Sequence, residues 1–381
     1  MSLTSSRPPR AKPGVGKPSN AKRLGRWHIA QLTATGLAVI FACGDPEQLG
    51  PWPELESGLD PNPPRECTAV ETLPERLSEH PCFDGRVPRP SSSMIPYDVR
   101  SALWSDGLRK ARFLAIPAAG DIGVTDAGSL ELPLGSVVVK EFSWGTRRIE
   151  TRLLSKVDPG TWRMATYMWN DAGTGAVRIS SGADIVLGDQ VWSIPPDDQC
   201  PVCHTEAAGR TLGLTLAQLN RDFRYPTTGR SANQLATLVN AGVMDHDGLD
   251  RPTALPAMAA PDDPSAPIDE RARAYLDTNC AHCHRPGGTS GGSLDLRDGA
   301  PFGLAGLCNQ RPQSADPLDG EGFIVVPGNP ERSILVFRLA SEDRYWRMSP
   351  VGTNQVDPTG VELVSTWIQG LDSCEEQAGT P

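Results

Sequence analysis

The sequence predicts an α+β chain of several domains, in which an antiparallel β domain is followed by two small all-α domains. The 381 residues exceed the roughly 250 residues that one hydrophobic core usually organises. With 38 Gly and 36 Pro, the chain is rich in turn formers, and alternating runs before residue 199 are typical of short strands. After residue 200, apolar residues recur at helical spacing, which favours all-α domains there.

The first 42 residues have the pattern of an export signal. They carry seven Lys and Arg and no acidic residue, and they end in an apolar run over 29–42 that is too short to span a bilayer. Cys43 directly follows Ala42 and resembles the acylated cysteine of a bacterial lipobox. We therefore expect lipidation at Cys43; a plain signal peptide that leaves Cys43 free is the alternative.

An acidic, Pro-rich stretch over 43–66 follows and predicts a flexible tether. Without residues 1–42 the chain has 29 basic and 46 acidic residues, a net charge of −17. Such a balance argues against binding to nucleic acid or to anionic lipid surfaces. Basic protein partners remain compatible with it.

Two runs support the β domain. The run 135–142 is rich in β-branched residues and begins at a glycine, and the run 161–169 alternates between two faces. Turn-forming residues at 158–160 and 170–173 bound the second run. This pattern favours an antiparallel meander over βαβ units.

Helical spacing begins after Cys200. Ser231 and Gln234 form a capping-box pattern ahead of an apolar helical face. A second helix is expected from Ile268 into Cys280, and two more over 334–339 and 363–371, each preceded by a capping residue and a proline.

Two pentapeptides share one spacing, Cys-x-x-Cys-His. They are Cys200 to His204 and Cys280 to His284. A bare Cys-x-x-Cys suits zinc or thiol redox chemistry, but the adjacent histidine is typical of c-type haem attachment. Two thiolates then form thioethers to the vinyl groups, and the histidine becomes the proximal iron ligand.

The sequence thus predicts two covalently bound haem c groups and their iron ligands, with zinc as the alternative cofactor. The attachment residues are Cys200, Cys203, Cys280 and Cys283, and the proximal ligands are His204 and His284. We expect His282, between the second pair of cysteines, to face solvent.

Methionines supply candidates for the sixth iron ligand, because a thioether in a loop can reach the far face of a haem. Met348 lies in a loop beside Pro350 and is the candidate for the second haem. For the first haem we favour Met258, with Met244 or His246 as alternatives and an open iron as a further possibility.

The remaining cysteines are Cys67, Cys82, Cys308 and Cys374. Four cysteines allow three pairings. The pairs Cys67–Cys82 and Cys308–Cys374 are the simplest, because each closes within one predicted domain.

Four stretches of the sequence, two of which contain these motifs, resemble a family of exported bacterial dihaem c-type cytochromes, commonly lipoproteins, whose role is largely unassigned. The stretches are 95–106, 133–140, 200–220 and 271–284, and the resemblance covers roughly residues 67–374. It implies both haem attachment sites and Met348 as a terminal ligand.

The expected organisation follows from these features. It comprises a signal peptide over 1–42, a tether over 43–66, a β-rich domain over 67–199, a first haem region over 200–262 and a second cytochrome c-like domain over 263–381.

We expect an electron carrier in the periplasm, lipid-anchored to the outer rather than the inner membrane, that serves unidentified redox partner proteins. No catalytic residue pattern is evident. One alternative is a peroxidase-like haem oxidoreductase with an open first haem, since no Met lies in 205–243; another is a module whose β domain binds a partner or a glycan.

The residues Tyr97, Asp98, Trp104 and Asp106 form a polar and aromatic cluster in the sequence. We interpret it as a turn and strand packing onto the β domain; the alternative is a cluster that lies against a haem or a substrate.

Overall fold

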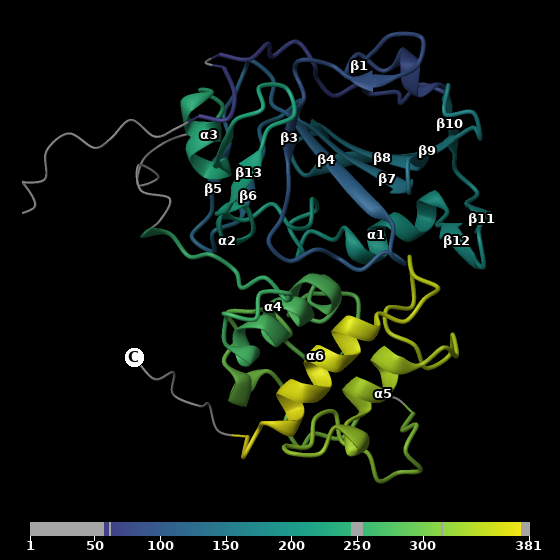
Figure 1. Cartoon of the computed structure of the whole chain (residues 1–381), viewed down its shortest axis with the longest axis vertical. Helices are drawn as coiled ribbons and strands as arrows, with labels where there is room; N and C mark the ends of the chain where they lie inside the picture. The colour runs from purple at the N-terminus through teal and green to yellow at the C-terminus, as the bar shows by residue number, and fades with distance from the viewer. Residues whose placement is uncertain (1–56, 61, 245–253, 291, 314, 375–381) are drawn as a thin grey trace, which may run out of the picture. The chain divides into compact units, whose positions relative to one another are not determined.

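The computed structural model describes residues 57–60, 62–244, 254–290, 292–313 and 315–374 (Figure 1). Its largest element is a six-stranded antiparallel sheet in the order β10-β9-β8-β7-β4-β3. The strands are β3 (Ile95–Tyr97), β4 (Arg109–Ala115), β7 (Val137–Trp144), β8 (Arg147–Asp158), β9 (Thr161–Trp169) and β10 (Ala176–Ile179). The strands expected at 135–142 and 161–169 are present as β7 and β9.

Apolar residues cover both faces of this sheet. Leu114, Val138 and Leu154 belong to one buried cluster. Val137, Val139 and Leu153 belong to a second cluster, as the alternation of side chains along a strand requires. A sheet buried on both faces explains why the Val-Val-Val run of β7 lacks polar alternation.

Four two-stranded sheets complete the β structure. They are β1 (Phe83–Asp84) with β2 (Arg89–Pro90), β5 (Gly123–Val124) with β6 (Leu130–Glu131), β11 (Ala183–Leu187) with β12 (Gln190–Ile194), and β13 (Asp222–Arg224) with β14 (Ser231–Asn233).

The α-helices of the described residues are six and short. They are α1 (Cys200–Cys203), α2 (Leu216–Leu219), α3 (Gln234–Asn240), α4 (Ile268–Cys280), α5 (Ile334–Ala340) and α6 (Pro358–Gln369), with 3-10 turns at Leu77–Glu79, Asp197–Gln199, Phe302–Leu304 and Pro330–Arg332. The described structure is mostly β and 20% helical. The predicted fold class, with two small all-α cytochrome c-type domains, is therefore wrong.

The segment 200–262 illustrates the physical reason. Helices of four or seven residues are too short to be stable alone, so α1, α2 and α3 depend on packing against the β structure. The Leu130 N–H donates to the Leu214 carbonyl, and the Ile122 N–H donates to the Val243 carbonyl. Apolar residues of this segment share one core with the sheet, so it does not form a separate all-α unit.

The start of α3 also differs from the expectation. Ser231 lies in strand β14, and Asn233 is the residue whose side chain caps the helix, accepting from the N–H groups of Leu235 and Ala236. The predicted capping box at Ser231 is therefore wrong, because strand pairing with β13 takes precedence over local capping.

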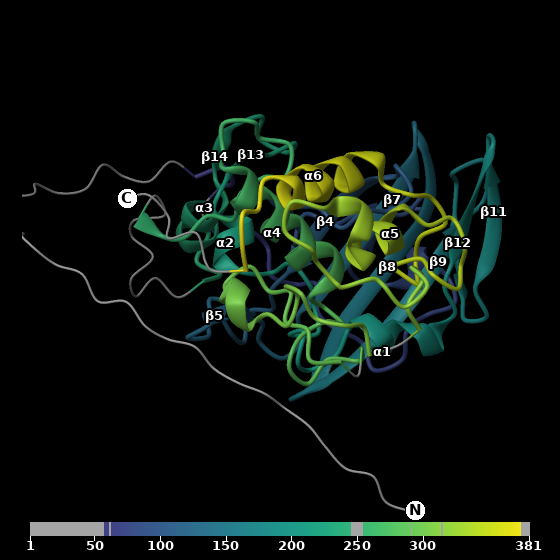
Figure 2. The same ribbon diagram turned by 90° about the horizontal axis from the view of Figure 1, so that it is seen from below.

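In the C-terminal part, α6 packs against α4 and α5 (Figure 2). Asp357 caps α6, since its side chain accepts from the Gly360 N–H at 3.1 Å. A Cβ at position 360 would lie 2.1 Å from the Tyr275 hydroxyl oxygen, so glycine lets α6 approach α4 closely.

Both predicted disulfides are confirmed. Cys67 pairs with Cys82 at a Cα–Cα distance of 4.8 Å, and Cys308 pairs with Cys374 at 5.5 Å. The second bond links the segment that follows α6 to the loop after Phe302–Leu304.

Candidate functional site

A cavity of about 850 Å³ brings both Cys-x-x-Cys-His motifs to one place. Its walls come from the inner face of the six-stranded sheet, from α1, from the end of α4 and from the loops before α4 and α6. Its size lies within the range of about 300–1,000 Å³ typical of small-molecule and cofactor pockets. The motif residues on its wall are Cys200, Cys203, His204, Cys280 and His282.

The first motif is held by α1 and by the loop after it. The His204 N–H donates to the Cys200 carbonyl at 3.0 Å, which closes the turn. The His204 Nδ1 lies 2.5 Å from the Arg210 carbonyl oxygen. Because a carbonyl can only accept, Nδ1 carries the proton and the Nε2 lone pair remains available to a metal.

Burial supports this neutral state of His204. It lowers the pKa of His204 to about 3, and the charge of Lys140 adds to the effect. A neutral imidazole with an oriented Nδ1–H is the form that ligates iron.

The second motif begins where α4 ends. The N–H groups of Cys283 and His284 both donate to the Cys280 carbonyl, at 3.0 and 2.9 Å. Cys280 and His282 line the cavity, whereas Cys283 and His284 lie outside its wall. The Nδ1 of His284 is buried and has no hydrogen-bond partner among the described residues.

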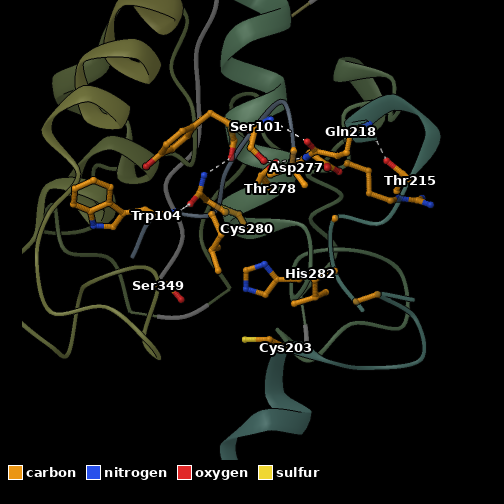
Figure 3. Close-up of a pocket in the computed structure, with 18 of the residues that line it drawn as sticks. Ser101, Trp104, Cys203, Thr215, Gln218, Asp277, Thr278, Cys280, His282 and Ser349 are labelled. Carbon is orange, nitrogen blue, oxygen red and sulfur yellow. Dashed lines mark hydrogen bonds between the residues drawn. The ribbon is translucent and has the colours of Figure 1, made fainter. Parts of the chain in front are cut away.

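The two motifs are in contact. One ligand atom each of Cys203, His282 and Cys283 lies within 4.8 Å of the others. Figure 3 shows His282 between Cys280 and Cys203, pointing into the pocket. The Thr289 hydroxyl donates to the Val202 carbonyl at 2.8 Å, which ties the second motif to the first.

The expectation that His282 faces solvent is wrong. Its exposed fraction is 6%, and it lines the cavity. The place of a residue within a sequence motif does not show what surrounds its side chain in the fold. Here Cys203 of the first motif lies beside the imidazole of His282.

Two of the candidate methionines line the cavity, and one does not. Met348 and Met258 are both on its wall, and the Thr278 hydroxyl lies 3.9 Å from the Met258 sulfur. Met244 instead belongs to the apolar core beside Val243. His246 lies outside the described residues, as does Cys43.

Four cations of the sheet also reach the cavity: Lys110, Arg112, Lys140 and Arg152. They were not predicted from the sequence, because a sequence does not distinguish a charged side chain at the surface from a buried one. One signal was present, since Lys140 ends the apolar run Val137, Val138, Val139, where a buried partner is needed.

Asp106 and Trp104 join the β structure to the C-terminal part. The carboxylate of Asp106, 2% exposed, accepts from the N–H groups of Asn354 and Gln355 at 2.8 and 3.0 Å. The indole of Trp104 donates to the Gln355 carbonyl at 2.9 Å. These two residues therefore position the loop between Met348 and α6, and Trp104 also lines the cavity.

Asp98 and Tyr97 lie within the β structure instead. Asp98 accepts from Arg112 at 2.6 Å and from Arg221 at 3.3 Å, and Tyr97 is buried in the core beside Leu114.

Comparison with models of protein families, with curated proteins and with solved structures found no match to this chain. Within the described residues, no helix has the length and apolar character needed to cross a membrane.

The residues present fit haem c as a covalently attached group. Among the described residues, the cysteines outside disulfides are Cys200, Cys203, Cys280 and Cys283, which are two thiol pairs at the attachment spacing. His204 offers Nε2, two thioethers line the cavity, and cations are available for carboxylates. A zinc ion at Cys203, His282 and Cys283 would have three ligands from the described residues, whereas structural zinc sites take four.

Proposed function

We propose that this chain is a dihaem c-type cytochrome that carries single electrons in the bacterial cell envelope. The observation that carries this proposal is the meeting of both Cys-x-x-Cys-His motifs at one cavity, with all four thiols free. A zinc site at Cys203, His282 and Cys283 would draw on both motifs but would give His204 and His284 no role, and a thiol redox site would use one pair of cysteines.

In this proposal each part of the site has a chemical task. The four cysteines anchor the two groups. His204, held through Nδ1 by the Arg210 carbonyl, would ligate the first iron through Nε2. His284, which follows the second pair of cysteines and whose Nδ1 has no hydrogen-bond partner among the described residues, would ligate the second. When bound, the haem supplies one-electron oxidation and reduction at its iron, at a potential set by axial ligand, burial and hydrogen bonding.

The chain itself controls the surroundings of these groups. Met258 and Met348, both on the cavity wall, would be the candidate thioether ligands of the two irons. Contact between the two motifs keeps both groups within one protein interior, as transfer between them requires.

The location and the partners are part of the proposal. The export signal and the cysteine at position 43 support a periplasmic protein with a lipid anchor, and the acidic balance after residue 42 suits basic redox partner proteins. Radiolabelled palmitate incorporated by the full chain and lost in Cys43→Ala tests the anchor.

Counting the cysteines that remain reactive distinguishes bound haem from bound zinc, because haem attachment consumes the thiols and zinc binding does not. Residues 44–381 are produced in a bacterial host with its haem attachment system, denatured, alkylated and weighed by mass spectrometry. Two added haem masses and no alkylated thiol are expected. Four alkylated cysteines with bound zinc would overturn the proposal; the double variant Cys200→Ala/Cys203→Ala should retain one haem.

A second candidate is a haem oxidoreductase whose first iron is open to a substrate, which the cavity of about 850 Å³ beside the first motif favours. Optical and low-temperature EPR spectra, with and without carbon monoxide, distinguish the two. Two low-spin haems without carbon monoxide binding support the carrier. Carbon monoxide bound at half of the haem supports the oxidoreductase.

A further inference from the structure

A row of three cations crosses the sheet on the cavity wall. Arg112 on β4 lies directly opposite Lys140 on β7, and Lys140 lies directly opposite Arg152 on β8. Neighbouring strands are about 4.8 Å apart, and all three side chains line the cavity. We refer to these three residues as the cationic row.

Packing gives no reason for these charges. Two residues along each strand, the same face carries Leu114, Val138 and Leu154, which belong to the apolar core. Like charges directly opposite on a sheet are destabilising. The cationic row therefore needs a counter-charge.

Among the described residues, carboxylates pair with two of these three cations. Asp98 lies 2.6 Å from Arg112, and Glu150 lies 2.6 Å from Arg152. Asp98 is also shared with Arg221 at 3.3 Å.

Lys140, in the middle of the row, forms no ion pair with a carboxylate in the part of the chain that the structure describes. Its ammonium donates to the Thr211 carbonyl at 3.5 Å. Burial, together with repulsion by Arg112 and Arg152, lowers the pKa of Lys140 to about 7. Lys110 adds a fourth cation to the same wall, and its ammonium donates to the Leu103 carbonyl.

We propose that the cationic row binds carboxylate groups at the cavity wall beside the first Cys-x-x-Cys-His motif. Arginine guanidinium groups bind carboxylates in a planar, two-point geometry, and Lys140 supplies a point charge between them. The carboxylates come either from haem propionates, in which case the inference rests on the proposed function, or from a diffusible small carboxylate that enters the cavity.

The variant Lys140→Met removes the central charge while keeping the length of the side chain, and Lys140→Arg retains the charge. Lys156→Met is the matched control: Lys156 lies on β8, where its ammonium donates to the Leu132 carbonyl at 2.6 Å. All three are made in residues 44–381, and their folding is checked by circular dichroism. Haem content is measured first, so that failure of the proposed function can be distinguished from failure of the inference on the cationic row.

Two measurements identify the source of the carboxylate. Resonance Raman spectra report the propionate bending modes of the haems, and calorimetric titration with acetate and succinate at constant ionic strength reports diffusible anions. If propionates occupy the row, Lys140→Met shifts a propionate mode of one haem, and Lys156→Met does not.

If a diffusible carboxylate occupies the row, the protein binds acetate or succinate, and Lys140→Met weakens that binding at least tenfold. In either case Lys140→Arg stays close to the unaltered protein. The inference is overturned if Lys140→Met leaves both readouts unchanged. It is also overturned if Lys140→Met changes them no more than the control Lys156→Met does. If the protein contains no haem, calorimetric titration with acetate and succinate still tests whether the cationic row binds carboxylates.

Discussion

The Sγ atoms of Cys203 and Cys283 lie within 4.8 Å of each other, although they belong to different Cys-x-x-Cys-His motifs. The two attachment sites are therefore neighbours in the folded chain. Any chemistry at one motif takes place in contact with the other.

This proximity predicts how the chain oxidises when haem is not attached. Exported from a host that lacks the attachment system, the chain should form a Cys203–Cys283 disulfide, because the two thiols are close and the compartment is oxidising. Peptide mapping without reduction detects the cross-link, and Cys283→Ser should abolish it. Bonds found only within each motif would contradict the observed proximity.

In the proposed dihaem protein, Met348→Leu and Met258→Leu should each remove a thioether ligand from one haem. The expected result is a high-spin iron, or loss of the methionine-to-iron absorption band, at one haem per variant, since leucine has no donor atom. Met244→Leu is the control, because Met244 lies in the apolar core and a volume-conserving change there costs less than about 1.5 kcal/mol. A change of spectrum in Met244→Leu alone would reverse the assignment of the first haem.

Gly360→Ala should destabilise the C-terminal part. Alanine is intrinsically better than glycine in a helix by about 1 kcal/mol, but its Cβ would lie 2.1 Å from the Tyr275 hydroxyl oxygen. We expect a net loss of about 1–3 kcal/mol from overpacking, measured by urea unfolding. Combining the change with Tyr275→Leu should restore part of the loss; an additive effect of the two changes would show that α4 and α6 do not meet there.

His80 should make stability depend on pH. It is 1% exposed, its Nδ1 accepts from the Cys82 N–H at 3.2 Å, and burial lowers the pKa of His80 from 6.5 to about 4. Between these two pH values the unfolded chain binds a proton that the folded chain does not. The free energy of unfolding therefore falls as the pH drops from 6.5 to about 4, by roughly 2–3 kcal/mol.

His80→Asn tests this dependence, since its amide oxygen can accept from the Cys82 N–H without titrating. The difference in unfolding free energy between the unaltered protein and His80→Asn should change across that pH range and stay constant above pH 7. A constant difference at every pH would show that His80 does not titrate as expected.

The two disulfides should contribute unequally. The bond Cys308–Cys374 spans 66 residues and Cys67–Cys82 spans 15, and loop-closure entropy predicts about 4 and about 3 kcal/mol. Paired Cys→Ala variants measured by urea unfolding check this order. A larger loss from the Cys67–Cys82 pair would mean that strain or packing outweighs chain entropy.

Local features of the site could be predicted from the sequence, and its surroundings could not. The spacing of the motifs, the helix that leads into Cys280, the capping of α6 by Asp357 and the two disulfide pairs are all readable in one dimension. The cationic row required the register of β4, β7 and β8, and the burial of His282 and the separation of Met244 from Met258 required tertiary packing. The haem assignments themselves remain predictions.

The sequence by itself determined the attachment chemistry that we propose, because that chemistry depends on residue types at fixed short spacings. It also determined the strands over 135–142 and 161–169 through their local patterns. Only the tertiary structure decided that residues 200–262 pack onto the sheet rather than forming an all-α domain, and that both motifs meet at one cavity. The reason is physical: helices of four to seven residues take their stability from long-range burial, and a spacing pattern contains no information on which surface does the burying.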